Sequence, residues 1–190
     1  MKKIYALLLI FSFHDLTAQT KLHVFKITPS VKADVEKVAN DYYSHFDYLK
    51  GEQIDETAQS IEYRCKLLPQ GALESTITEF KNQQNVYSWQ AVMLNTEDFN
   101  KAEKKYKELY KQLDGSSFML HGSKKYNLEG VYDIPTEERA FASSILSLDV
   151  NQKGLQLLKI EVSLSYLLPD WSVKLLIYEK QSDEDIRPSE

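Results

Sequence analysis

The chain has 190 residues, 43% of them hydrophobic and 27% charged, and a formal net charge of −5 at pH 7. This mildly acidic balance gives no basis for nucleic acid as a partner, because binding to a phosphate backbone needs a surplus of Lys and Arg. The single cysteine, Cys65, excludes a disulfide within the chain, so stability has to come from packing.

Residues 1–18 have the features of a bacterial export signal. A pair of lysines precedes an apolar run of ten residues, Ile4–Phe13, and a small residue, Ala18, follows. Ten residues are too few for a membrane-spanning helix, which needs roughly 20. We therefore expect a signal peptide that is cleaved after Ala18 or Gln19, a periplasmic or extracellular location, and no membrane span in the mature chain.

The rest of the chain is interpreted as one domain. Residues 20–180 are enough for a single core that buries roughly 70% of the surface of the unfolded chain. Residues 181–190 are acidic and carry little apolar surface, which predicts a disordered tail.

The first half of this domain predicts a helix and three strands. The apolar residues of the expected helix recur at steps of three and four and are Val31, Val35, Val38, Tyr42, Phe46 and Leu49. Gly51 is expected to end the helix. From Ser60 the period changes to two, as in strands with one buried face. The expected strands are Ile61–Leu67, Leu73–Thr78 and Tyr87–Leu94, which short links would join into an antiparallel meander.

The second half repeats this order. Its helix has one apolar stripe, formed by Phe99, Ala102, Tyr106, Leu109, Tyr110 and Leu113. Asn95 or Thr96 is expected to cap the helix, and Gly115 to end it. Four or five strands are expected after it, at Ser117–His121, Tyr126–Tyr132, Phe141–Val150, Leu158–Tyr166 and Trp171–Glu179.

The predicted fold class is therefore α+β. We expect a single antiparallel sheet of about six to eight strands, with two amphipathic helices packed on one face, in the order α-βββ-α-βββ(β). The shared order of the two halves leaves an internal duplication open, because no residue-level repeat is visible.

Two residues are weak candidates for catalysis. The period-two pattern of its expected strand places Cys65 on the buried face, where a thiol is inert. His121 lies at the end of an expected strand, a position where sites do occur, but no second histidine stands at a metal-ligand spacing. We assign no catalytic residue, metal or cofactor, and whether the chain is an enzyme stays open, with a non-catalytic role favoured.

Tyrosine is the one residue type in excess, with twelve in the chain. Exposed tyrosines provide contact area at low entropic cost, for a protein or a carbohydrate partner. The candidates for such a surface are Tyr43, Tyr48, Tyr126 and Tyr132.

The favoured hypothesis is an exported α+β protein that acts as a non-catalytic binding or accessory module. One alternative is a small periplasmic or secreted hydrolase with a site around His121. Another is a secretion-chaperone-like protein, suggested only by the order of helices and strands. No oligomeric state is assigned.

Overall fold

The computed structural model describes residues 30–81, 86–120, 122, 124–149 and 155–180. The expected signal peptide, the expected tail and His121 lie outside these residues. The described helices and strands are, in chain order, α1 (Val31–Tyr42), β1 (Lys50–Glu56), β2 (Ser60–Cys65), β3 (Glu74–Phe80), β4 (Val86–Thr96), α2 (Phe99–Leu113), β5 (Ser117–Leu120), β6 (Lys124–Gly130), β7 (Phe141–Leu148), β8 (Leu158–Leu167) and β9 (Asp170–Glu179).

All of these strands belong to one antiparallel sheet, as predicted, with the order β1-β2-β3-β4-β9-β8-β7-β6-β5. In each half of the chain the strands run in sequence order from one edge of the sheet to its centre. The two halves meet where β4 pairs with β9, for example at Trp89 and Ile177 and at Ala91 and Leu175. The strands of the two halves are therefore arranged in the same way, from the edge of the sheet to its centre.

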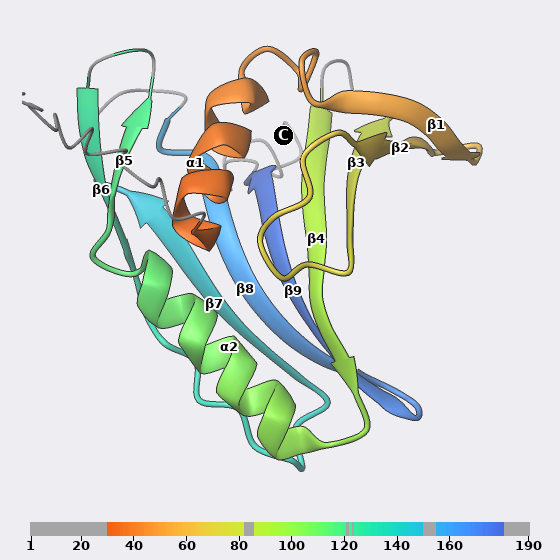
Figure 1. Ribbon diagram of the computed structural model, residues 1–190, viewed down its shortest axis with the longest axis vertical. Helices are drawn as coiled ribbons and strands as arrows, with labels where there is room; N and C mark the ends of the chain where they lie inside the picture. Colours follow the sequence, from red (N-terminus) through yellow and green to blue (C-terminus); the bar gives the residue numbers. More distant parts are fainter. Residues whose placement is uncertain (1–29, 82–85, 121, 123, 150–154, 181–190) are drawn as a thin grey trace, which may run out of the picture.

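Both helices lie on the same face of the sheet (Figure 1). α2 packs against β4, β8 and β9, and α1 packs against β5 and α2. One hydrophobic core fills the space between the helices and the sheet. Its largest fully buried side chains include Trp89, Tyr106, Phe46, Phe118 and Ile77.

Each helix begins at a capping side chain. Ser30 Oγ accepts the backbone N–H of Ala33 at 3.2 Å at the start of α1. Asp98 caps α2 and accepts the N–H of Lys101 at 3.2 Å. The predicted cap at Asn95 or Thr96 was wrong, because β4 continues through Thr96 and the helix begins only at Phe99.

The first helix is shorter than predicted. It ends at Tyr42, whereas the apolar spacing continued to Leu49. The chain leaves the helix because His45 and Phe46 adopt left-handed backbone conformations, with φ of 55° and 57°. Phe46 is nevertheless completely buried, so a loop rather than a helix places it in the core.

The predicted strand count and element order need correction. The described chain has nine strands in the order α-ββββ-α-βββββ, rather than six to eight in the order α-βββ-α-βββ(β). The missed strand of the first half is β1, an exposed edge strand of mostly polar residues that has no alternation to detect. Gly51 lies within β1 and does not end the helix, and a Cβ there would stand 2.5 Å from the carbonyl oxygen of Arg64.

Candidate functional site

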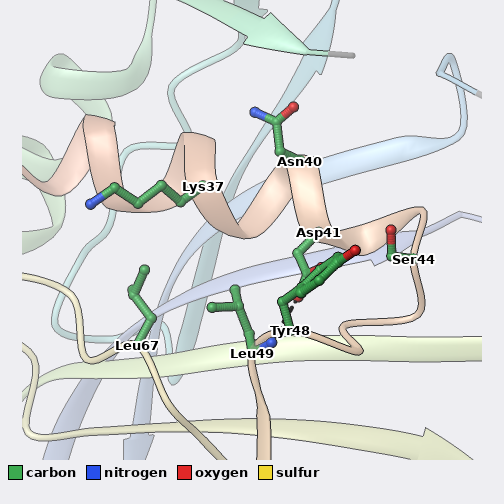
Figure 2. A pocket seen from close by; sticks show the side chains of 7 residues that line it. All are labelled: Lys37, Asn40, Asp41, Ser44, Tyr48, Leu49 and Leu67. Atoms are coloured by element: carbon green, nitrogen blue, oxygen red, sulfur yellow. Dashed lines mark hydrogen bonds between the residues drawn. The ribbon is translucent and has the colours of Figure 1, made fainter. Parts of the chain in front are cut away.

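A pocket of about 460 Å³ lies beside the C-terminal end of α1 (Figure 2). We call it the α1–β1 pocket, because the helix and the loop that leads to β1 form most of its wall. Its lining residues are Lys37, Asn40 and Asp41 of α1, Ser44, Tyr48 and Leu49 of the loop, and Leu67 after β2.

Asp41 is the buried charged residue of this pocket, with 7% of its surface exposed. Its Oδ2 accepts the backbone N–H of Leu49 at 2.9 Å. Its carbonyl oxygen accepts the N–H groups of Ser44 and Phe46, each at 3.0 Å. Asp41 therefore stabilises the loop from its position in the last turn of α1.

The other carboxylate oxygen of Asp41, Oδ1, is buried and has no hydrogen-bond donor among the described residues. Leaving a buried acceptor unpaired costs about 1–3 kcal/mol, and more for a charged group. One oxygen of the Asp41 carboxylate thus stabilises the loop, while the other is enclosed by the protein without a hydrogen bond from a described residue.

The basic residues near the pocket are engaged elsewhere. Lys37 Nζ lies 3.3 Å from Asp34 Oδ1 in an exposed ion pair. Lys66 Nζ donates to the carbonyl oxygen of Tyr48 at 3.3 Å. Asn40 also directs its amide away from the cavity, donating to the carbonyl oxygens of Glu36 and Met119. The charged residues of the pocket wall are therefore Asp41 and Lys37, and the Lys37 ammonium is paired with Asp34.

The remaining wall is apolar. Leu49 and Leu67 are half-buried and pack against the hydrophobic core. Tyr48 lies at the mouth of the pocket with 78% of its surface exposed. Figure 2 shows Leu49 and Leu67 opposite α1, with their side chains directed toward the helix. The pocket thus combines apolar side chains with polar residues of α1 and the loop.

A second polar cluster lies between α2 and β7. The hydroxyl oxygens of Tyr106 and Ser144 are 2.6 Å apart, and Tyr106 donates to the carbonyl oxygen of Asp133 at 3.1 Å. Ser144 Oγ accepts the N–H of Asp133 at 3.0 Å, and the Asp133 carboxylate accepts two bonds from Arg139. Burial raises the pKa of Tyr106 to about 12, so its hydroxyl stays protonated. The cluster anchors the segment before β7.

Of the two predicted candidates for catalysis, the structure describes only Cys65. Cys65 ends β2 and is buried, with 7% of its surface exposed. His121 lies outside the described residues, so its candidacy stays a prediction.

The four candidate tyrosines are distributed over different parts of the fold. Tyr48 lines the α1–β1 pocket, and Tyr132 packs against the rings of Tyr106 and Tyr110, with centroids 5.5 Å and 5.1 Å apart. Tyr43 packs edge-on against Tyr42, and Tyr126 is half-buried on β6. Of the four, Tyr48 is the one that lines the pocket.

The described part of the chain contains no group of three or more His, Cys, Asp or Glu side chains that could hold a metal ion. No helix among these residues has the length and apolar character needed to cross a bilayer. Comparisons of the chain with protein-family models, with curated proteins and with solved structures find no match.

Proposed function

We propose that the protein is an exported, non-catalytic binding module that takes its ligand in the α1–β1 pocket. The observation that carries the proposal is a cavity of about 460 Å³ whose largely apolar wall includes the buried residue Asp41. Ligand sites typically occupy about 300–1,000 Å³ and combine apolar walls with a few placed polar groups. The α1–β1 pocket has this combination.

The chemistry of the wall supports binding over catalysis. Acid–base catalysis needs a second group that is positioned to exchange a proton with the first one or with the substrate. Lys37 is paired with Asp34 at the rim, and Tyr48 is largely exposed. Asp41 also has one oxygen committed to the loop. This arrangement is suited to holding a ligand in place.

The export part of the proposal is supported by the N-terminal lysines, the apolar run and the small residue Ala18. It is tested by expressing the chain with its own N-terminus in a bacterium and sequencing the exported product by mass spectrometry. We expect a mature chain that begins at Gln19 or Thr20. Recovery of only the full-length chain in the cytoplasmic fraction would contradict export.

The binding part is tested by blocking the pocket. Leu67→Trp should fill the cavity. Leu68→Trp is the control, because it introduces the same side chain at the next residue, which is 57% exposed and is not part of the pocket wall. Ligand-observed NMR with a panel of small cationic, anionic and neutral molecules would be recorded for the mature wild type and both variants.

We expect at least one class of molecule to lose its binding signal with Leu67→Trp and to keep it with Leu68→Trp. Ser44→Trp, which enters the same cavity from the loop, provides a second block if Leu67→Trp does not fold. The proposal fails if no molecule in the panel binds in a way that depends on either block.

A further inference from the structure

We infer that the α1–β1 pocket receives the β8–β9 turn of a second copy of this chain. This inference rests on the proposed function and names the partner that fills the pocket. The turn consists of Leu168 and Pro169, between the ends of β8 and β9. In Figure 1 the loop after α1 lies at the top of the fold and this turn lies at the bottom. The turn of one copy therefore meets the pocket of another copy and not its own pocket.

The turn presents two neighbouring leucines to solvent. Leu167 and Leu168 have 69% and 83% of their surfaces exposed. Phe141, which is 53% exposed, extends this apolar surface, because it lies opposite Ser165 and thus diagonally beside Leu167 on the same face of the sheet. Single exposed apolar residues are ordinary, but a contiguous apolar group is typical of a contact surface. We therefore expect a partner to cover the turn.

The turn stands on an ordered base. β8 and β9 pair along their whole length, up to Leu167 opposite Asp170. Next to the turn, the ring centroids of Tyr166 and Trp171 lie 4.9 Å apart, and Trp171 also packs against Phe99 at 5.0 Å. A surface that is already ordered loses little conformational entropy when it binds. The leucines are thus presented in a fixed position, which favours docking.

The pocket offers a matching apolar surface. Leu49 and Leu67 line its cavity of about 460 Å³, and Figure 2 shows both side chains directed toward α1. A leucine that enters this cavity removes its own apolar surface and that of the wall from water. Full burial of one leucine side chain corresponds to about tenfold or more in affinity. The leucines of the turn are therefore suited to this cavity.

Two unpaired charges of opposite sign flank these apolar surfaces. Lys66 directly precedes Leu67, and its Nζ donates at 3.3 Å to the carbonyl oxygen of Tyr48, a residue of the pocket wall. Asp170 directly follows the turn and is half-buried. Neither Lys66 nor Asp170 belongs to an ion pair among the described residues. A copy whose Leu168 enters the pocket brings its Asp170 toward Lys66, and this charge match favours a second copy as the partner.

The other charges around the pocket leave this pairing in place. The Lys37 ammonium is paired with Asp34 at 3.3 Å. Asp41 is only 7% exposed, and Asp47 is exposed on the loop but does not line the pocket. Of these five groups, Lys66 is the cation that is open to a carboxylate from another molecule.

The contact between one turn and one pocket is small, so we expect weak association. Stable protein interfaces bury about 1,200–2,000 Å² in total, which a single hairpin turn does not provide. The dissociation constant should then be on the order of 0.1–1 mM. Sedimentation velocity with the mature chain, from about 10 μM to about 1 mM, covers this range. We expect the sedimentation coefficient to rise with concentration.

The decisive test uses two complementary variants. Leu168→Asp disrupts the turn and keeps the pocket, whereas Leu67→Trp blocks the pocket and keeps the turn. We expect each variant alone to associate at least about tenfold more weakly than the wild type. A mixture of the two retains one intact turn and one intact pocket, so it should form a 1:1 complex with close to the wild-type affinity. Val131→Asp is the control, since Val131 is also 83% exposed but lies outside the turn and the pocket.

The charge match is tested by exchange. Asp170→Lys and Lys66→Asp should each weaken association by about threefold, as expected for an exposed ion pair. A chain with both changes carries the exchanged pair at every contact, so it should regain most of the lost affinity. Isotope-filtered NMR of mixed labelled and unlabelled wild-type copies should show contacts from the methyl groups of Leu168 to those of Leu49 and Leu67.

The inference is overturned if the chain stays monomeric up to about 1 mM, or if the mixture of Leu168→Asp and Leu67→Trp forms no complex. A monomeric chain that binds phosphatidylcholine vesicles and loses this binding with Leu168→Asp would assign the turn to a bilayer instead. Ser44→Trp, which also enters the cavity, takes the place of Leu67→Trp if that variant does not fold.

These failures are distinct from failure of the proposed function. A small molecule that binds a monomeric chain and is displaced by Leu67→Trp keeps the pocket as a binding site and rejects the second copy. Self-association that Leu168→Asp abolishes and Leu67→Trp leaves unchanged rejects the pocket as the partner of the turn.

Discussion

The Asp41 carboxylate accepts the backbone N–H of Leu49, eight positions further along the chain, at a distance of 2.9 Å. This bond closes the loop between α1 and β1 and sets the geometry of the pocket. We expect Asp41→Ala to lower the free energy of unfolding by about 1–3 kcal/mol, because the N–H loses its acceptor. Asp41→Asn should cost less than half as much. Urea unfolding of both variants measures the difference, and equal losses would contradict the role of this bond.

Tyr106 and Ser144 form a coupled pair inside the second polar cluster. Tyr106→Phe leaves the Ser144 hydroxyl and the carbonyl oxygen of Asp133 without one partner each, so we expect a loss of about 1–3 kcal/mol. Ser144→Ala should have a similar effect. The double variant should lose less than the sum, by about 1 kcal/mol. Additive losses in a double-mutant cycle would show that the two hydroxyls act independently.

Buried tyrosines should make the protein sensitive to alkali. Burial raises the pKa of both Tyr43 and Tyr106 from 10.0 to about 12. Burial also raises the pKa of Tyr42 and of Tyr178, and the nearby carboxylates of Glu179 and Glu161, respectively, raise these two further. The folded state therefore holds these protons more tightly than the unfolded state does. The stability that Tyr43 and Tyr106 contribute in this way is complete below pH 10 and is lost as the pH rises through about 12.

The measurement is the free energy of unfolding as a function of pH, together with the ultraviolet absorbance of tyrosinate. Tyr106→Phe should make the decline above pH 10 shallower, since one of the shifted groups is removed. An unchanged slope in this variant would contradict the assignment.

Gly51 should tolerate no side chain. A Cβ at this position would lie 2.5 Å from the carbonyl oxygen of Arg64, a backbone atom of the paired strand. We expect Gly51→Ala to push β1 away from β2 and to lower stability by about 1–3 kcal/mol. Asp55→Ala, an exposed change in the same strand, should cost much less. Faster amide hydrogen exchange in β1 with Gly51→Ala alone would identify the displaced strand.

The parts of the fold with a clear hydrophobic period could be predicted from the sequence. α2 and the strands of the sheet centre have apolar residues at spacings that only one secondary structure satisfies. β1 could not be found in this way, because it is held by backbone hydrogen bonds at an exposed edge and buries almost no apolar surface. The end of α1 was missed because left-handed residues at His45 and Phe46 leave no mark in the apolar spacing.

The candidate site was less accessible to prediction than the fold. Its central bond joins Asp41 to a backbone N–H eight residues away, and its wall includes Leu67 from beyond β2. Neither contact follows from local periodicity. Tyr48 was singled out because tyrosine was in excess, and it is the one predicted surface residue that lines the pocket. The sequence around Asp41 also does not indicate that this carboxylate is buried.

The pairing of β4 with β9 has a consequence for how the chain is made. The seam between the halves joins residues 86–96 to residues 170–179, so the middle of the sheet cannot close until nearly the whole domain has been synthesised. Such distant pairing slows folding. A polypeptide threaded N-terminus first through a translocation channel would therefore still be unfolded while most of it passes. Truncation before residue 170 would leave β4 and β8 as bare edges that invite aggregation.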